Sequence, residues 1–263
     1  MIVIWNQGKG KRGSELLAEE RFHEIIRLVN ERKTMTVQEL TELLDSSESA
    51  IRRDLTELHK RHQLVKVHGG ATALQLGYTT KDEAVSVRKD MNMEEKQRIA
   101  KYAAERIEKN DFVYVDAETT TGCLIDWICE QGAVFVTNGI VHARTLAEKG
   151  YKVFLLGGEL KAATEAVVGG ETMESLKRYH FTKGFFGTNG IHEEAGFTTP
   201  DIHEAFVKEQ AMKQCRECYV LADSTKIGKI SAVRFGTFHE ATVLTTDLQD
   251  ARWKKYKNIV EVK

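Results

Sequence analysis

The chain has 263 residues, of which 41% are hydrophobic and 29% charged. This apolar share can build a core, which excludes wholesale disorder, and the length suits one large domain or two smaller ones. There is no apolar run near the ~18–20 residues of a membrane span, no secretory leader, and no disulfide scaffold, so a cytoplasmic protein is expected. The 38 basic and 39 acidic side chains nearly cancel, so the distribution of charge is more informative than its total.

Residues 18–74 predict a small helical unit that ends in a hairpin. Apolar side chains first recur at the i, i+3, i+4, i+7 spacing of an amphipathic helix, and Thr36 with Glu39 then forms the capping-box pattern that begins a second helix. Ser47 is the expected N-cap of a third helix. The apolar faces of these helices consist of Phe22, Ile25, Ile26, Val29, Val37, Leu40, Leu43, Leu44, Ile51, Leu55 and Leu58.

A strand over residues 64–68 and a turn at Gly69-Gly70 follow the third helix, and this order predicts a winged helix-turn-helix. Between Arg52 and His68 five side chains are Lys or Arg and two are acidic, a local patch that can meet phosphates. Arg52 and Arg53 fall off the apolar face, and their guanidinium groups suit guanine and phosphate. A helical protein-interaction module is the alternative. The residues expected to contact double-stranded operator DNA are Ser47, Ser49, Arg52, Arg53, Lys66, His68 and Gly69.

From about Asp111 short apolar runs alternate with helical patterns, which predicts an α/β domain with a mainly parallel sheet over residues 92–263. Residues 75–91 are expected to be a linker, and Asn92 with Glu95 is expected to cap a helix that runs to about Lys109. Strands are predicted at residues 112–115, 134–136, 153–156, 185–186, 219–222 and 242–244. Helices are predicted at residues 123–130, 140–149, 171–179 and 201–215. Residues 1–17 are expected to be an extra N-terminal segment.

Polar loops follow the predicted strands, at residues 116–122, 137–139, 157–158, 187–190 and 223–226. In an open parallel sheet such loops line one rim, where ligands bind. Threonine hydroxyls and N–H groups at a helix start suit an anion, and Asn, Asp and Lys suit sugar hydroxyls and a phosphate. The rim therefore predicts a phosphorylated small-molecule ligand, although each loop is also an ordinary turn or cap sequence. Three aspartates end strands, namely Asp116, Asp223 and Asp247, but such residues more often cap the next helix, so no metal is expected.

Two further motifs have a simpler explanation. Residues 8–13 match the GxGxxG spacing of dinucleotide-binding loops, but no second strand of a βαβ unit follows them. Cys215 and Cys218 form a lone CxxC pair, which lacks the four ligands of a structural zinc site. We therefore expect no cofactor, and we expect both thiols to be buried.

The sequence from Glu48 to Leu55, followed by Val67 to Ala71, closely resembles the signature of the DeoR family of bacterial transcriptional repressors. Residues 186–201 resemble the branch of that family that governs fructose utilisation. The resemblance implies a sensor domain similar to ribose-5-phosphate isomerases, and a repressor that a sugar phosphate such as fructose 1-phosphate releases from its operator. The effector-binding residues that it implies are Asp116, Thr119, Thr120, Thr121, Thr137, Asn138, Asn189, Lys208 and Lys226.

Two positions depart from the pattern of the family. Ala50 stands where the family usually has Thr, which removes a hydroxyl that could touch a DNA phosphate. Glu118 stands where the family usually has glycine, beside the phosphate cradle implied at Thr119–Thr121. A carboxylate there either points away from the phosphate, contacts a sugar hydroxyl or lowers the affinity for the effector.

The isomerase relatives carry a carboxylate base in the loop that corresponds to residues 187–190, whereas Asn189 cannot act as a base. The resemblance therefore implies a homo-oligomeric repressor, dimeric or tetrameric, and not an enzyme. A metabolic isomerase with a helical interaction module is the alternative from another class. A regulator that answers to another sugar phosphate, such as tagatose 6-phosphate, is the alternative within the family.

Overall fold

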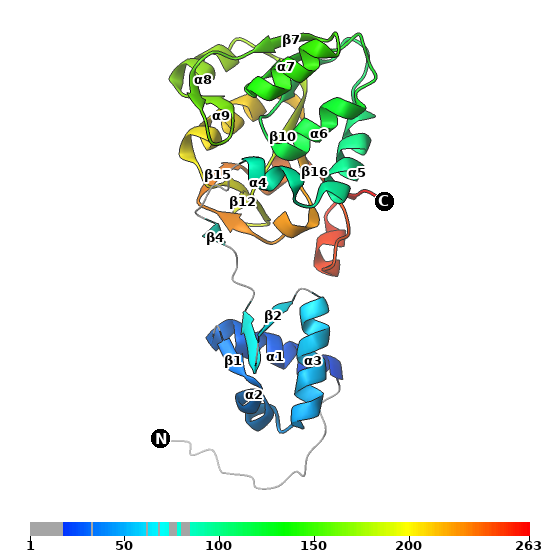
Figure 1. Ribbon diagram of the computed structural model, residues 1–263, viewed down its shortest axis with the longest axis vertical. Coiled ribbons are helices and arrows are strands. Elements are labelled where there is room, and N and C mark those ends of the chain that lie inside the picture. Colours follow the sequence, from blue (N-terminus) through cyan, green and yellow to red (C-terminus); the bar gives the residue numbers. More distant parts are fainter. Residues whose placement is uncertain (1–17, 33, 62, 68, 74–77, 80–84) are drawn as a thin grey trace, which may run out of the picture. The chain divides into compact units, whose positions relative to one another are not determined.

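The computed structural model describes residues 18–32, 34–61, 63–67, 69–73, 78–79 and 85–263. The chain divides into two compact units, one up to residue 76 and one from residue 77 onward. Figure 1 shows a small helical unit and a larger α/β unit. Each unit has its own buried hydrophobic side chains. Among the helices in the described ranges, none is long and apolar enough to cross a membrane.

The first unit has the element order of a winged helix-turn-helix, as predicted. Its described elements are α1 (Ala18–Arg32), β1 (Thr34–Thr36), α2 (Val37–Leu44), α3 (Glu48–Lys60), β2 (Leu64–Val67) and β3 (Gly70–Ala73). The strands form an antiparallel sheet in the order β1-β3-β2. The predicted capping box begins α2, because Thr36 Oγ1 accepts a hydrogen bond from the N–H of Glu39 at 3.1 Å. Ser47 caps α3 by accepting from the N–H of Ala50 at 3.3 Å.

The core of this unit follows the predicted apolar faces with two exceptions. Leu43 is 49% exposed, because α2 packs through Val37, Leu40 and Leu44 and leaves the intervening position outside. Ile26 is only partly buried at the margin of the core. The wholly buried side chains include Ile25, Leu40, Ile51, Leu55 and Leu58.

Two adjacent glycines join the hairpin to the rest of the first unit. Gly69 has a φ of +82°, which favours glycine, and its carbonyl accepts a hydrogen bond from the N–H of Val37 at 2.8 Å. A Cβ on Gly70 would lie 2.2 Å from the carbonyl oxygen of Met35, so this position requires glycine for close packing against β1. The predicted turn at Gly69-Gly70 is therefore a tertiary contact as well as a local bend.

The second unit is built on a parallel sheet with the order β17-β16-β13-β10-β5-β6-β7. Its strands are β5 (Phe112–Val115), β6 (Val134–Thr137), β7 (Lys152–Leu155), β10 (Phe181–Gly187), β13 (Cys215–Leu221), β16 (Thr242–Thr245) and β17 (Ile259–Glu261). All neighbouring pairs run parallel, which confirms the predicted α/β class. The sequence pattern predicts each of these strands except β17, which is short and only half-buried.

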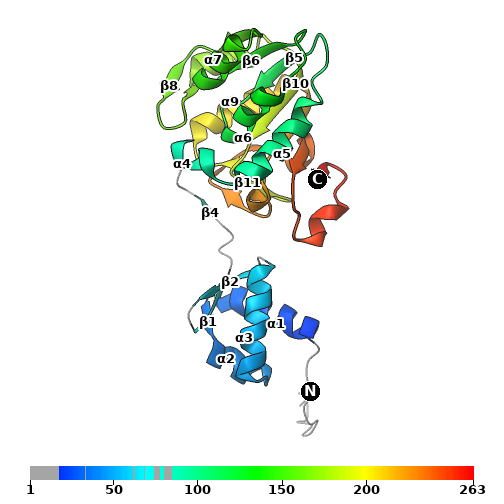
Figure 2. The ribbon, with the colours of Figure 1, turned by 45° about the vertical axis from the view of Figure 1, so that its right-hand side comes forward.

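Two separate apolar layers cover the faces of this sheet (Figure 2). One contains the helices α5 (Met93–Ala104), α6 (Thr119–Trp127) and α7 (Ile140–Glu148). The other contains α8 (Gly170–Leu176), α9 (Ile202–Lys213) and a small antiparallel sheet of β11 (Gly190–His192), β12 (Gly196–Thr199) and β15 (Val233–Gly236). Side chains alternate between the layers along β5, since Val113 and Val115 join the first and Tyr114 the second.

Short elements complete the second unit. A hairpin forms between β8 (Glu159–Lys161) and β9 (Ala166–Val168), and a 3₁₀ turn, η1, covers Ser224–Lys226. Within the stretch expected as a linker, the structure forms β4 (Tyr78–Thr79), which pairs with β14 (Ile230–Ser231), and the helix α4 (Val85–Asp90). This stretch thus contributes elements to the sensor unit.

The predicted cap of α5 is wrong. Asn92 has a φ of +52° and makes no side-chain cap; its Nδ2 instead donates to Asp223 Oδ1 at 3.1 Å. Glu95 accepts from the N–H of Ser224 at 2.8 Å and from Thr246 Oγ1 at 2.6 Å. Both side chains therefore tie α5 to loops at the carboxyl ends of strands, a long-range role that local spacing cannot distinguish from capping. The helix also ends at Ala104, short of the predicted end near Lys109.

Candidate functional site

The exposed face of α3 is the first candidate site. Arg52 and Arg53 are both exposed, as predicted. Arg52 Nη2 lies 2.5 Å from Glu48 Oε1 one turn away, and both side chains are more than half exposed. Arg53 Nε donates weakly, at 3.4 Å, to the carbonyl of Ser49. Exposed pairs of this kind contribute little to stability, so both guanidinium groups can exchange these partners for an external anion.

The other predicted DNA-contacting residues have additional local roles. Ser47 Oγ caps α3 and lies 3.1 Å from Ser49 Oγ. Lys66, on β2, donates from Nζ to Thr56 Oγ1 of α3 at 2.7 Å, which holds the wing strand beside that helix. Gly69 is exposed in the turn. His68 lies outside the described residues.

A buried ion pair makes the surface of α3 more basic than its sequence indicates. Asp54 is only 6% exposed, and both of its carboxylate oxygens accept from Arg21 of α1, at 2.5 and 3.2 Å. Burial therefore removes from the surface one of the two acidic residues counted between Arg52 and His68. The same pair fixes α3 against α1, and neither residue was singled out from the sequence.

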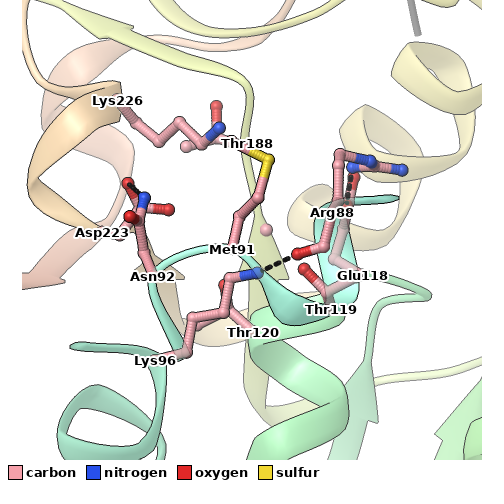
Figure 3. A pocket seen from close by; sticks show the side chains of 11 residues that line it. Arg88, Met91, Asn92, Lys96, Glu118, Thr119, Thr120, Thr188, Asp223 and Lys226 are labelled. Atoms are coloured by element: carbon pink, nitrogen blue, oxygen red, sulfur yellow. Dashed lines mark hydrogen bonds and ion pairs between the residues drawn. The ribbon is translucent and has the colours of Figure 1, made fainter. Parts of the chain in front are cut away.

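A pocket at the carboxyl rim of the parallel sheet is the second candidate site (Figure 3). Its walls come from the α4–α5 segment, the start of α6, and the loops that follow β10 and β13. The lining residues are Arg88, Met91, Asn92, Lys96, Glu118, Thr119, Thr120, Gly187, Thr188, Asp223 and Lys226. The close-up places Arg88 and Glu118 on one side of the pocket and Asn92, Asp223 and Lys226 on the other.

Three cationic side chains face this pocket, and Lys96 is the most unusual of them. It is 3% exposed, and its Nζ donates a hydrogen bond to the backbone carbonyl of Arg88. Within the described residues no carboxylate lies in ion-pair contact with it. Burial lowers its pKa. A buried ammonium group that relies on a carbonyl partner gains electrostatic stabilisation when an anion enters beside it.

The start of α6 supplies further anion-binding groups. Thr119 and Thr120 occupy the first turn of the helix and line the pocket. The first N–H groups of any α-helix lack partners within the helix, and its dipole favours negative charge at this end. Thr121, one position further, is fully buried, and its Oγ1 donates to the carbonyl of Asp116 at 2.5 Å. It therefore holds the loop in place and does not line the pocket.

A buried network neutralises Glu118, the residue at which the chain departs from its family pattern. Glu118 Oε2 accepts from Arg88 Nη1 at 2.7 Å, and Oε1 accepts from Lys208 Nζ at 3.1 Å. Burial alone would raise the pKa of Glu118, but the charges of Lys208 and Arg88 outweigh it and hold this pKa at about 2. A Cβ on Gly187 would lie 2.4 Å from the Glu118 side chain, so glycine is required there.

Lys208 is shared by two carboxylates. Its Nζ donates to Asp116 Oδ2 as well as to Glu118, and all three side chains are buried. Burial raises the pKa of Asp116, and the nearby charge of Glu118 raises it further against the pull of Lys208. The two carboxylates together raise the pKa of Lys208 despite its burial. Lys208 and Asp116 are held within this network and do not line the pocket, whereas Glu118 does.

Of the nine implied effector-binding residues, the structure brings Thr119, Thr120 and Lys226 to the pocket. The others lie buried behind it with partners in the protein. Asn138 Oδ1 accepts from Tyr114 Oη at 3.1 Å and from the N–H of Ala117 at 3.0 Å. The same arrangement holds at Thr137, whose Oγ1 accepts from the N–H of Gly139 at 3.0 Å, and at Asn189, whose Oδ1 accepts from Thr199 Oγ1 at 3.2 Å. Asp116, Thr121 and Lys208 complete the buried set.

The α4–α5 wall was missed from the sequence. Arg88, Met91 and Asn92 fall in or beside the stretch expected as a linker. Lys96 did carry a signal, because Ile99, Ala100 and Ala103 follow it at i+3, i+4 and i+7 and are buried. A lysine on the apolar face of a helix is a strong indication of a functional or structural ion contact.

The remaining motifs carry no site in the described ranges. No group of three or more His, Cys, Asp or Glu side chains there could hold a metal ion. Cys215 and Cys218 are half-buried rather than buried, and their thiols donate to carbonyls at the end of α9, at 3.2 and 3.6 Å. Residues 8–13 lie outside the described part of the chain.

Comparison with known families identifies both units. Residues 21–75 match the DeoR-like helix-turn-helix domain, and residues 91–248 match the DeoR C terminal sensor domain. The chain belongs to the DeoR family of transcriptional repressors. Family membership confirms the resemblance seen in the third helix and the wing, and the sensor-domain match contains every pocket-lining residue except Arg88.

Individual relatives match over nearly the whole chain. The "Uncharacterized HTH-type transcriptional regulator FruR" of Bacillus subtilis (strain 168) is 40% identical over 94% of this chain and 98% of its own. The lactose phosphotransferase system repressor of Streptococcus mutans is 34% identical over 92% and 98%. Among solved structures, ribose 5-phosphate isomerase A of Methanocaldococcus jannaschii matches at a TM-score of 0.38 with 12% identity, over 52% of this chain and 55% of that one. The sorbitol operon regulator SorC of Klebsiella pneumoniae matches at 0.36 with 10% identity, over 77% and 88%.

Proposed function

We propose that this protein represses a sugar-utilisation operon and leaves its operator when a phosphorylated sugar binds at the rim of the sensor sheet. The observation that carries the proposal is the buried ammonium group of Lys96, which faces the start of α6 in a pocket also lined by Lys226. Such a pocket suits a phosphate monoester, and it belongs to the same chain as an exposed pair of arginines on α3.

The effector is expected to place its phosphate at Thr119 and Thr120, between the cations Lys96 and Lys226. Asn92, Asp223 and Thr188 line the rest of the pocket and are expected to contact the sugar, although each also bonds within the protein. We expect six buried residues to contribute by holding the loops, since they bond within the protein and do not line the pocket: Asp116, Thr121, Thr137, Asn138, Asn189 and Lys208.

Glu118 sets the charge balance of this site. Two like unit charges 4 Å apart repel each other by ~1 kcal/mol in water and ~4 kcal/mol near a protein surface. A carboxylate without a counter-charge would therefore oppose phosphate binding. The ion pair with Arg88 and the contact with Lys208 offset that charge. The departure from the family glycine is therefore compatible with a phosphate ligand.

On the DNA side, Arg52 and Arg53 are expected to meet base edges and phosphates in the major groove. Ser47, Ser49, Lys66, His68 and Gly69 are proposed to contact the backbone from the start of α3 and from the wing. A homodimer or tetramer would space two recognition helices to match successive half-sites.

The pKa and the ion pairing of Glu118 and Asp116 favour a sensor over an enzyme. An isomerase needs a carboxylate whose pKa suits proton transfer near neutral pH. The pKa of Glu118 is held at about 2. Burial raises the pKa of Asp116, but this residue is ion-paired with Lys208 and does not line the pocket. Asn189, in the loop where the isomerases carry their base, accepts from Thr199. Turnover of a ketose or aldose phosphate by the purified protein would contradict this assignment.

Fructose 1-phosphate is the effector that we propose, on the resemblance of residues 186–201 and on the relative named FruR. The similarity to lactose phosphotransferase system repressors favours a second candidate, tagatose 6-phosphate. A thermal-shift screen separates them, because a ligand that binds only the folded state raises its melting temperature. Fructose 1-phosphate should give the largest rise; a larger rise with tagatose 6-phosphate would replace it, and no rise with any sugar phosphate would contradict the sensor assignment.

A further inference from the structure

The outer face of α9 carries apolar side chains that stay exposed. Ile202 and Phe206 lie one turn apart and are 48% and 43% exposed. Counted from Ile202, Glu209 and Lys213 continue the same stripe at i+7 and i+11, and they form an ion pair with an Nζ–Oε1 distance of 2.6 Å. The opposite face of the helix is buried in the core of the sensor unit. The exposed stripe is therefore apolar in the first half of α9 and charged in the second.

The hairpin of β8 and β9 extends this apolar surface at the start of α9. Lys161 Nζ lies 3.0 Å from Glu204 Oε1 and 3.2 Å from Asp201 Oδ2, and Thr164 Oγ1 donates to Glu204 at 2.6 Å. These contacts hold the strand that carries Leu160, which is 51% exposed, beside the first turn of α9. Single exposed apolar side chains are ordinary on a protein surface, whereas a group of them indicates an interaction surface.

The two ends of α9 carry opposite charges. Asp201 caps the start of the helix by accepting from the N–H of Glu204 at 2.9 Å. Lys213 ends the helix and Arg216 follows it on β13, and both are exposed. A second α9 that runs antiparallel to the first would place each acidic start beside a basic end, and the two helix dipoles would also oppose each other. The charges of this face are therefore complementary to themselves under a two-fold axis, as an interface between two identical surfaces requires.

The edge strand β7 is another exposed apolar surface of the sensor unit. Its Phe154 is 42% exposed, nearly the same fraction as Phe206. The ammonium group of Lys152 lies 5.6 Å from the centre of the Phe154 ring. A charged side chain on a short edge strand protects that edge from pairing with another strand. This protection of β7 favours the α9 face as the surface that another molecule covers.

We propose that the outer face of α9, together with Leu160 of the hairpin, binds the same face of a second copy of this chain across a two-fold axis. The inference rests on the proposed function for the need of two DNA-binding units at one operator. The two copies of α9 run antiparallel. Phe206, Ile202 and Leu160 form the apolar centre, and Asp201 faces Lys213 of the second copy at both ends. An apolar centre with a charged rim is the usual anatomy of a specific interface, and burial of these side chains stabilises it.

Sedimentation velocity of the full-length protein, without DNA or effector, measures the mass of the assembly. Phe206→Glu places a carboxylate in the centre of the interface. We expect it to weaken self-association roughly 100-fold, as the loss of a central anchor does, and to halve the mass found for the wild-type protein. Phe154→Glu is the matched control, because it makes the same change at an almost equally exposed Phe of the same unit, and it should leave the mass unchanged. Ile202→Glu, on the same stripe, serves where Phe206→Glu alters the melting temperature.

Operator affinity gives a second measurement, with a duplex that the protein itself selects from a random-sequence library. Phe206→Glu should weaken binding to this duplex by roughly tenfold or more, because a single chain loses the gain in affinity from two linked DNA contacts. Phe154→Glu should bind the duplex with the affinity of the wild-type protein.

The outcomes separate this interface from the proposed function. If the wild-type protein sediments as one chain, or if Phe206→Glu and Ile202→Glu both keep the wild-type mass, the α9 interface is overturned, whatever the response to sugar phosphate. A halved mass for Phe154→Glu would assign the interface to the β7 edge and overturn it as well. If the α9 variants halve the mass, yet no sugar phosphate releases the wild-type protein from its duplex, the interface stands and the proposed function fails.

Discussion

The two candidate sites hold their positive charges in opposite ways. On α3 the guanidinium groups of Arg52 and Arg53 are exposed, and their partners lie within the same helix. At the sensor rim, Arg88, Lys96 and Lys208 are buried. Arg88 and Lys208 are held by carboxylates far away in the chain, and Lys96 by the backbone carbonyl of Arg88. An exposed cation costs little free energy and suits a polyanion such as DNA, whereas a buried cation is costly and suits one small anion that enters its pocket.

The largest effect on the free energy of unfolding is expected at the buried Arg21–Asp54 ion pair of the DNA-binding unit. Asp54→Ala should lower the free energy of unfolding by about 3–5 kcal/mol, because it leaves Arg21 without its buried carboxylate. Glu48→Gln removes an exposed partner of Arg52 on the same helix and should cost only about 0.3–0.5 kcal/mol. Urea denaturation measures the free energy of unfolding of both variants. Equal losses in the two variants would contradict the expected difference between the buried and the exposed ion pair.

Lys96→Met should weaken effector binding by about 2 kcal/mol or more, roughly 30-fold, because a buried charge-assisted contact is lost. Protein stability should stay equal or rise, since the substitution also removes the burial of an ammonium group. Calorimetric titration with the sugar phosphate gives the first quantity and thermal melting the second. Unchanged effector affinity would remove Lys96 from the site.

Arg53→Ala should weaken operator binding by about 1–3 kcal/mol and leave effector affinity unchanged. The wild-type affinity should also fall steeply with salt, because phosphate contacts release counterions. Fluorescence anisotropy against salt concentration measures both. A variant that binds the operator normally would show that α3 does not read the duplex.

The two sites also differ in how far the sequence predicts them. On α3 the binding face is set by helical spacing alone, so Ile51, Leu55 and Leu58 locate the core and place Arg52 and Arg53 outside it. The sequence predicts the rim loops as a group, since parallel strands bring their carboxyl ends together. Tertiary packing decides which side chains face the pocket, and the sequence does not predict it. Asn138 and Lys208 bond within the protein and do not line the pocket. The α4–α5 wall is formed by a stretch whose sequence resembles a linker.

Acid should destabilise the sensor unit through His142. This side chain is 9% exposed, its Nε2 lies 3.1 Å from the carbonyl of Glu118, and burial lowers its pKa to about 4. Below about pH 6.5, the ordinary pKa of a histidine, His142 is protonated in the unfolded state but stays neutral in the folded state. The free energy of unfolding therefore falls by about 1.4 kcal/mol for each pH unit. The fall covers the range from about pH 6.5 down to about pH 4. His142→Asn should flatten it in denaturation curves; an unchanged slope would assign the loss to other groups.

Lys226→Ala should have the smallest effect, about 1 kcal/mol on effector affinity. Lys226 is half-buried, on a short turn, and it faces the pocket from the side opposite to Arg88. Operator binding without effector should remain normal, so the variant needs roughly fivefold more sugar phosphate for release. A normal response to every sugar phosphate would mean that the ligand does not reach this side of the pocket.

The central claim is that binding of a phosphate in the sensor pocket lowers the affinity of the exposed arginines of α3 for DNA. Titration of the wild-type protein, bound to its selected duplex, with the sugar phosphate that gives the largest thermal shift tests this most directly. We expect the duplex to be released as the pocket fills, and the Lys96→Met variant to retain the duplex at the same concentrations. Retention of the duplex by the wild-type protein at saturating sugar phosphate would contradict it.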